Sequence, residues 1–158
     1  MTKPPSDTAL VFQVFNEVGI INQLSSAQFG RVLGPLGLGQ SEFGVLNHFV
    51  RVGDGTTPSR LACNFQMSKP SMTAILGKLQ AKGLVEITGS EEDRRKKIVT
   101  ITEAGRRARQ HAVEAVAPLG AQVLQACDRE QLRAILPILV ELRQYLDAAR
   151  EGEDGLQH

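Results

Sequence analysis

The chain has 158 residues and an ordinary hydrophobic content of 42%, which favours one globular domain that needs no disulfides or metals. No apolar run approaches the roughly 18 residues that span a bilayer, and residues 1–7 lack the basic and apolar parts of a secretory signal. The cysteines Cys63 and Cys127 match no metal-ligand spacing, so we expect a cytoplasmic protein with no disulfide framework, no metal and no cofactor.

The net charge of +1 conceals an uneven distribution along the chain. Between Thr57 and Arg107, ten basic residues stand against five acidic ones, a balance of +5 that leaves −4 for the rest. Clustered positive charge in an otherwise acidic chain indicates a middle segment that binds a polyanion. The same count also fits a charged surface that only contacts water.

Helical spacing of apolar residues and capping signals divide the N-terminal half into four predicted helices. Gly34-Pro35 ends the first helix, and the second is apolar on more than one side, so we expect it to be largely buried. Thr57 caps the third helix with Pro58 at its first position. Ser68 caps the fourth, which Gly83 ends. The four helices cover Thr8 to Leu33, Gln40 or Ser41 to Val52, Thr57 to about Asn64, and Ser68 to Ala81 or Lys82.

A β-hairpin follows the fourth helix. The segments Leu84–Thr88 and Lys97–Ile101 are rich in valine, isoleucine and threonine, which predicts two short strands. The connecting turn, Gly89–Lys96, is highly charged. It contains part of a run of four cations, which repel one another unless nearby acids or an external anion neutralise them. We expect Asp93 to orient one of the two arginines, Arg94 and Arg95, while the other projects into a narrow DNA minor groove.

Two long helices complete the chain. Thr102 caps one that continues to about Ala126, and a capping box at Asp128 begins the last helix, which we expect to end at Arg150. Pro118 and Pro137 lie inside these helices and are expected to kink or interrupt them. The remaining tail, residues 151–158, is polar and expected to be frayed.

The order of elements predicts a mainly α fold with a small β-wing, a winged helix-turn-helix. Two helices joined by a short turn allow the second to enter a DNA major groove. Its outward side carries mostly small residues, which permit close approach to base edges, although small exposed residues are also tolerated without a function. These outward residues are Pro70, Thr73, Ala74, Gly77, Lys78 and Ala81.

Lys69 is a further indication of an anionic partner. A cation in the first turn opposes the helix dipole, but it becomes favourable when a phosphate lies at that helix end. Ser68 and Ser71 offer hydroxyls in the same place. The alternative is an ordinary surface lysine.

From about Gln40 to Gly105 the sequence resembles the MarR family of multiple-antibiotic-resistance-type regulators. The matching segments are Ser68–Thr73, Leu79–Val85, Asp93–Arg95 and Thr100–Gly105. The resemblance implies that Ser68–Lys78 is the recognition helix and that Arg95 enters the minor groove. It also implies a homodimer formed by the first helix and the last two. The implied regions are 1–38 for dimerisation, 39–105 for DNA binding, 106–150 for dimerisation and 151–158 for the tail.

The resemblance also implies an effector site between the first two helices, the long helix and the wing domain. Polar residues among apolar ones nominate Asn16, Asn47 and His48, with His111 as a weaker candidate. Each of these also fits an ordinary interior or surface position. Family members that sense oxidants carry a reactive cysteine in the first helix, and this chain has none there. We expect Cys63 to be a small buried apolar residue.

The sequence therefore predicts a sequence-specific DNA-binding transcriptional regulator, a homodimeric repressor that a small molecule releases from a near-palindromic operator. No catalytic motif is present, so we predict no enzyme. One alternative is a winged-helix module that binds protein, because this fold hosts both functions. A cysteine-based redox-sensing regulator is the other.

Overall fold

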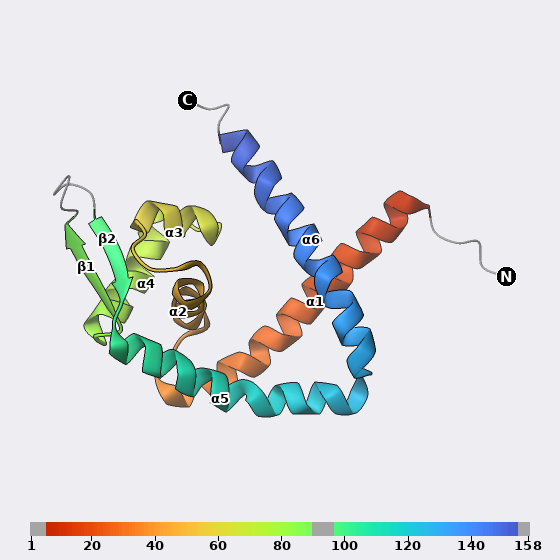
Figure 1. Ribbon diagram of the computed structural model, residues 1–158, viewed down its shortest axis with the longest axis horizontal. Helices are drawn as coiled ribbons and strands as arrows, with labels where there is room; N and C mark the ends of the chain where they lie inside the picture. The colour runs from red at the N-terminus through yellow and green to blue at the C-terminus, as the bar shows by residue number, and fades with distance from the viewer. Residues whose placement is uncertain (1–5, 90–96, 155–158) are drawn as a thin grey trace. The chain divides into compact units, whose positions relative to one another are not determined.

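The computed structural model describes residues 6–89 and 97–154, with side chains for all of these except residues 150–154. The described elements are the helices α1 (Asp7–Leu33), α2 (Gln40–Val52), α3 (Pro58–Asn64), α4 (Lys69–Ala81), α5 (Glu103–Ala126) and α6 (Arg129–Asp154), the 3₁₀ turn η1 (Gly34–Leu36), and the strands β1 (Val85–Gly89) and β2 (Lys97–Ile101) (Figure 1). The chain forms two compact units, Met1–Ala117 and Pro118–His158. The predicted winged helix-turn-helix lies within the first unit.

Side-chain caps begin the helices where the sequence predicts. Thr57 Oγ1 accepts a hydrogen bond from the Arg60 amide at 3.2 Å, and Ser68 Oγ accepts one from the Ser71 amide at 3.2 Å. Thr102 Oγ1 does the same for Gly105 at 3.0 Å. Each bond satisfies an N–H group that has no partner inside its helix. The helix starts predicted from these caps are confirmed.

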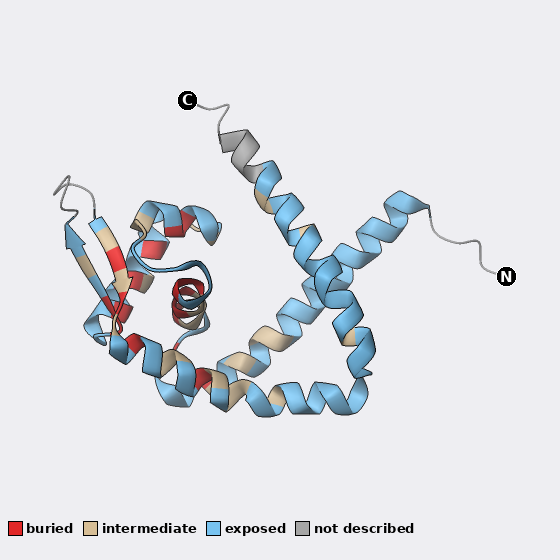
Figure 2. Cartoon of the chain, viewed as in Figure 1, coloured by how far each residue is buried: buried red, intermediate tan, exposed pale blue. Residues whose placement is uncertain are grey.

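The core of the first unit lies between α2, α3, α4 and the hairpin, where Figure 2 shows the buried residues. The inward side of α4 consists of Met72, Leu76 and Leu79, which are at most 1% exposed, with Ile75 partly buried beside them. The largest side chains that complete this core are Phe49, Leu46, Leu33 and Leu61. Most of α1 remains exposed, and only its C-terminal end, with Leu33, enters the core.

The hairpin is held against the helices by backbone and side-chain bonds. Strands β1 and β2 pair antiparallel with Val85 opposite Ile101, and Val99 exchanges two backbone hydrogen bonds with Thr56 at 2.8 and 3.3 Å. Asp54 Oδ1 accepts a bond from the Ile101 amide at 2.9 Å, while Oδ2 pairs with Arg106 at 2.9 Å. The loop between α2 and α3 therefore fixes the strand that leads out of the wing.

The interruption that was one of the two expected effects of Pro118 and Pro137 is absent, because α5 and α6 continue through these residues. A kink at either proline stays a prediction. A proline removes one hydrogen bond, and the remaining bonds of a long helix can span that gap. The last helix also reaches Asp154, beyond the predicted end.

Cys63 is exposed, contrary to the expectation of a buried residue. Its neighbours Leu61 and Ala62 occupy the inward side of the short helix α3, so the next residue turns away from the core. In α2, Val50 is likewise 45% exposed although the helix is otherwise well buried.

Gly105 lets the start of α5 approach the backbone of Leu84, which lies between α4 and β1. A Cβ atom there would overlap the Leu84 carbonyl oxygen and lie 2.8 Å from Ile101 Cγ1. Because Leu84 contributes backbone and not a movable side chain, the clash cannot be relieved by a rotamer change. Gly77 in α4, by contrast, has nothing within 4 Å of the corresponding position.

We predict that Gly105→Ala lowers the free energy of unfolding by about 1–3 kcal/mol, the cost of overpacking. Gly77→Ala is the matched control and should raise it by about 0.5–1 kcal/mol through helix propensity. Urea denaturation followed by circular dichroism measures both. Equal effects of the two substitutions would contradict the close packing of α5 on Leu84.

Candidate nucleic-acid interface

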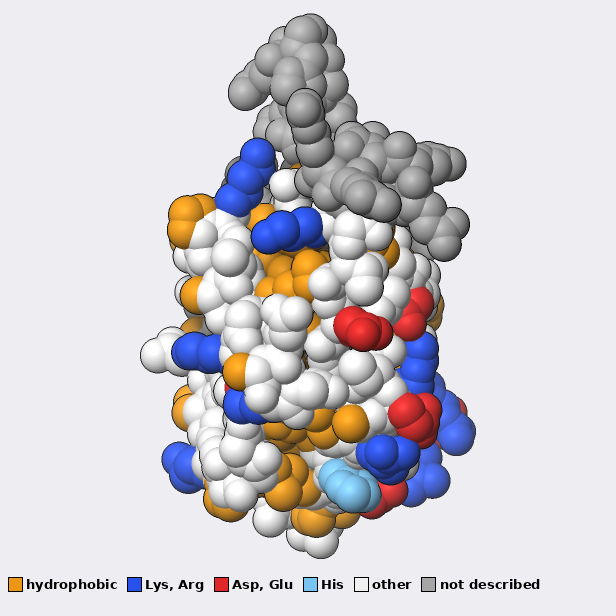
Figure 3. Space-filling view, turned by 90° about the vertical axis from the view of Figure 1, so that its left-hand side faces the viewer, with side chains coloured by type: hydrophobic (Ala, Val, Ile, Leu, Met, Phe, Trp, Pro, Cys, Tyr) orange, Lys and Arg blue, Asp and Glu red, His pale blue; other side chains and the backbone are white. Residues whose placement is uncertain are grey.

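Helices α3 and α4 form a helix pair that presents a basic surface. From Gly55 to Val85 the chain contains no acidic residue. Its cations are Arg60, Lys69, Lys78 and Lys82, and all four are exposed. Figure 3 shows the side of the molecule that carries the hairpin, where several lysine and arginine side chains lie next to exposed hydrophobic ones. Within residues 55–85 of the sequence, no acidic residue therefore offsets these four positive charges.

The outward residues of α4 have the exposure that the sequence analysis expects. Those predicted to contact DNA from this segment are all exposed: Ser68, Lys69, Pro70, Ser71, Thr73, Ala74 and Lys78. At the N-terminus the hydroxyls of Ser68 and Ser71 lie 2.8 Å apart. Thr73 donates its hydroxyl hydrogen to the Lys69 carbonyl at 2.8 Å, which fixes its rotamer. The structure therefore brings this group together on one accessible helix.

The wing residues Asp93, Arg94 and Arg95 lie outside the described residues. Their predicted roles in orienting the wing and entering the minor groove remain predictions.

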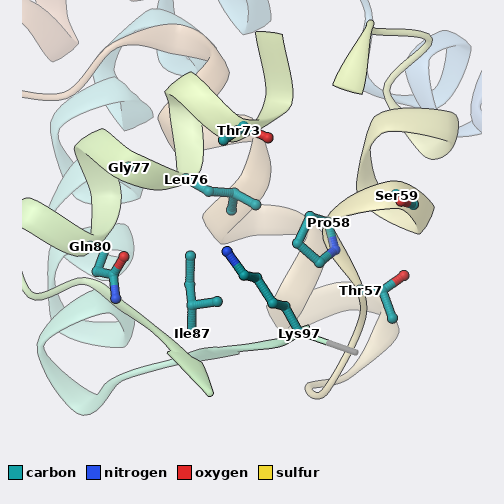
Figure 4. Close-up of a pocket in the computed structure, with 9 residues that line it drawn as sticks. All are labelled: Thr57, Pro58, Ser59, Thr73, Leu76, Gly77, Gln80, Ile87 and Lys97. Atoms are coloured by element: carbon teal, nitrogen blue, oxygen red, sulfur yellow. The ribbon is translucent and has the colours of Figure 1, made fainter. Parts of the chain in front are cut away.

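A groove of about 600 Å³ separates α4 from the hairpin (Figure 4). Leu76 and Ile87 form an apolar floor with Pro58, and the other lining residues are Thr57, Ser59, Thr73, Gly77, Gln80 and Lys97. Lys97 begins the second strand, as the sequence predicts, but no site role was expected of Ser59, Gln80 or Lys97. Alternation along β2 could have indicated Lys97, because it shares a strand face with Val99 and Ile101.

An ion pair anchors the far end of α4. Lys82 Nζ donates to both carboxylate oxygens of Glu42, at 2.8 and 2.9 Å, and to the Gly37 carbonyl at 2.6 Å. Glu42 is only 5% exposed, and its Oε2 also accepts the Gly39 amide at 2.5 Å. Glu42 is the third residue of α2, and its carboxylate satisfies the amide of Gly39, the residue just before the helix, as the acidic member of a capping box does.

Two opposing effects set the pKa of Glu42. Burial raises it, but hydrogen bonds from Lys82 and Gly39 and the positive charges of Lys82 and Lys78 outweigh burial, so the pKa lies below its ordinary value of 4.5. The carboxylate therefore contributes stability at neutral pH that is lost as the pH falls through its folded pKa.

The four candidate effector residues lie on three helices, α1, α2 and α5. Asn16 is exposed on α1 and His111 on α5, whereas the Asn47 side-chain oxygen accepts a hydrogen bond from Arg109 Nε at 2.8 Å. His48 lines a smaller cavity of about 280 Å³ with Asp54, Arg60 and others. The His48 ring lies edge-on to the Phe65 ring, with 5.6 Å between the ring centres. Burial of His48, and to a smaller extent the positive charge of Arg51, lowers the pKa of this histidine below its ordinary value of 6.5.

The described part of the chain holds no group of three or more histidine, cysteine or acidic side chains placed to hold a metal ion. Among the described helices, none combines the length and apolar character needed to cross a membrane.

Residues 36–96 match the sequence model of the MarR family. The curated transcriptional activatory protein BadR of Rhodopseudomonas palustris is 32% identical over 72 residues, which are 44% of this chain and only 41% of that protein. The solved transcriptional regulator BldR of Sulfolobus solfataricus is 28% identical with a TM-score of 0.72, covering 87% of this chain and 99% of BldR. A MarR mutant from E. coli complexed with operator DNA has a TM-score of 0.69 over 87% of this chain and 99% of its own, at 19% identity.

We predict that Glu42→Gln lowers the free energy of unfolding by about 2 kcal/mol at pH 7, because the uncharged amide no longer forms the ion pair with Lys82. Glu86→Gln, at an exposed strand position, is the control and should change it by less than about 0.5 kcal/mol. Below pH 4.5 the deficit of Glu42→Gln should shrink as the native carboxylate is protonated. Denaturation at several pH values measures this, and a deficit independent of pH would contradict the ion pair.

Proposed function

Because the chain belongs to the MarR family of winged-helix regulators, we propose that it is a sequence-specific DNA-binding transcriptional regulator and not an enzyme. The observation that carries the proposal is α4, whose buried stripe is anchored in the core while Lys69, Thr73 and Lys78 remain accessible. A second helix presented in this way fits the major groove of B-DNA. The relative solved with operator DNA supports the same use of the fold.

The contacts divide into those that position the protein and those that discriminate sequence. Lys69, in the first turn of α4, meets a phosphate, since the helix N-terminus attracts anions. Thr73 and Ala74 approach base edges, where a threonine methyl can contact thymine. Arg95 enters the adjacent minor groove, and Asp93 orients the wing.

We predict that Lys69→Ala weakens binding to all duplexes similarly and reduces the slope of log affinity against log salt by about one unit. Arg95→Ala should cost on the order of 1–3 kcal/mol and most where A·T tracts flank the half-site. Arg94→Ala is the matched control and should cost less, because neighbouring hairpin residues point apart. Equal, flank-independent losses for Arg94→Ala and Arg95→Ala would contradict the assignment of Arg95.

The functional form is proposed to be a two-fold homodimer. Nine large hydrophobic side chains between Leu10 and Leu24 on α1 are 40–74% exposed, and seven between Ile135 and Leu146 on α6 are 37–70% exposed. Apolar surface of this extent is typical of a protein interface. A two-fold dimer is the commonest closed assembly and presents two recognition helices to a near-palindromic operator.

We predict that Ile21→Glu yields a folded monomer at micromolar concentration, because it places a charge on the apolar side of α1, where Ile21 is 62% exposed. Gln23→Glu adds the same charge on the polar side of that helix and should leave the dimer intact. Sedimentation velocity measures both. A native chain that sediments as a monomer yet binds DNA fully would contradict the dimer.

Release from DNA is proposed to follow binding of a small molecule, which makes the protein a ligand-responsive repressor. Asn47 and Arg109 join α2 to α5, and His48 lies beside Asn47 on α2 and lines a cavity. With Asn16 and His111 they are the candidate effector residues. A ligand that displaces the Asn47–Arg109 hydrogen bond would alter the contact between the DNA-binding region and the helix that leaves it.

A further inference from the structure

The spacing of the DNA grooves constrains what passes between α4 and the wing. In B-DNA each major groove is separated from the neighbouring minor groove by one sugar–phosphate strand. A protein that places a helix in the first and a hairpin tip in the second must accommodate that strand between them. In this chain the space between those two elements is the groove of about 600 Å³.

We propose that this groove binds the intervening DNA strand and that Lys97 contacts one of its phosphodiesters. The inference rests on the proposed function and adds a site for the backbone to the base-contacting surface of α4. Of the residues expected from the sequence to contact DNA, Thr73 lines this groove, whereas no contact was expected of Lys97.

The position of Lys97 follows from the register of the hairpin. Lys97 pairs with Gly89 at the outer end of β2, and its side chain lies on the same strand face as the buried Val99. The core ends before it reaches this position, so the ammonium group extends into the groove and points toward Leu76, as Figure 4 shows. A lysine in this position packs its methylene stem on the apolar surface and keeps its ammonium group accessible, where an anion can pair with it.

Lys97 is available to a ligand. Within residues 6–89 and 97–149 no carboxylate lies within ion-pair distance of its ammonium group. Ser59 and Gln80, on opposite walls, also make no side-chain hydrogen bond in that part of the chain. The groove therefore offers an ammonium, a hydroxyl and an amide, all groups that donate hydrogen bonds to phosphate oxygens.

The apolar floor of the groove fits the sugar of the nucleotide backbone. Leu76, Ile87 and Pro58 present carbon atoms below the polar rim. A deoxyribose ring is largely apolar on its faces, whereas its phosphate is charged, so the sugar packs on the floor and the phosphate meets Lys97. This arrangement connects helix and wing to one strand and fixes their register without discriminating between bases.

The test compares native protein and Lys97→Met on duplexes in which one phosphate at a time is replaced by a neutral methylphosphonate. The replaced positions run along the strand between the half-site and the flanking minor groove. We expect Lys97→Met to weaken binding about 5- to 10-fold for every operator sequence and to lower the salt slope by about 0.9. At one phosphate position the methylphosphonate should weaken the native protein by a similar factor and leave Lys97→Met almost unaffected.

Two control variants separate this contact from general charge and from folding. Lys97→Arg keeps the cation and should restore most of the affinity, while Arg143→Gln removes a cation that pairs with Asp147 within α6 and should have little effect. Equal sensitivity of native protein and Lys97→Met at every phosphate position overturns the proposed contact while DNA binding itself stands. Failure of the native protein to bind any duplex overturns the proposed function as well.

Discussion

Packing of one side of α4 against the core leaves its other side exposed to solvent. The rest of the DNA-binding region depends on this packing. Met72, Leu76 and Leu79 provide the apolar part of the anchor, each contributing about 1.5–3 kcal/mol through burial. The Glu42–Lys82 pair provides the polar part, at the end of the helix where the apolar stripe stops. A helix anchored at both places presents its exposed residues in one fixed orientation, which base-edge contacts require.

The wing depends on the same anchor through the loop before α3 and the start of α5. Asp54 and Thr56 bind strand β2, and Gly105 allows α5 to approach Leu84 directly after α4. Helix and hairpin therefore keep a constant separation. That separation creates the groove that contains Lys97, so packing in the core determines the surface available to a DNA strand.

Local signals made most of the fold predictable. Thr57, Ser68 and Thr102 begin their helices through their own side chains. The two segments rich in valine, isoleucine and threonine specified the hairpin to within one residue. What depended on tertiary contacts was missed. Nothing near Glu42 or Lys82 in sequence indicates that they meet, because forty residues separate them. The exposure of Cys63 and the continuity of the helices at Pro118 and Pro137 depend on which helix side faces the core and on neighbouring turns. No site role was expected of Lys97, because its groove exists only after α4 packs.

Selection of bound duplexes from a random pool, repeated at two salt concentrations, tests the central claim most directly. A rigidly held α4 in a two-fold dimer predicts enrichment of a near-palindrome whose half-sites lie about one helical turn apart, roughly 10 base pairs. Raising the salt should weaken binding overall while the enriched sequence stays the same, since phosphate contacts depend on salt and base contacts carry specificity. Recovery of unrelated sequences at both salt concentrations would contradict a sequence-reading helix and leave only attraction between a basic surface and DNA.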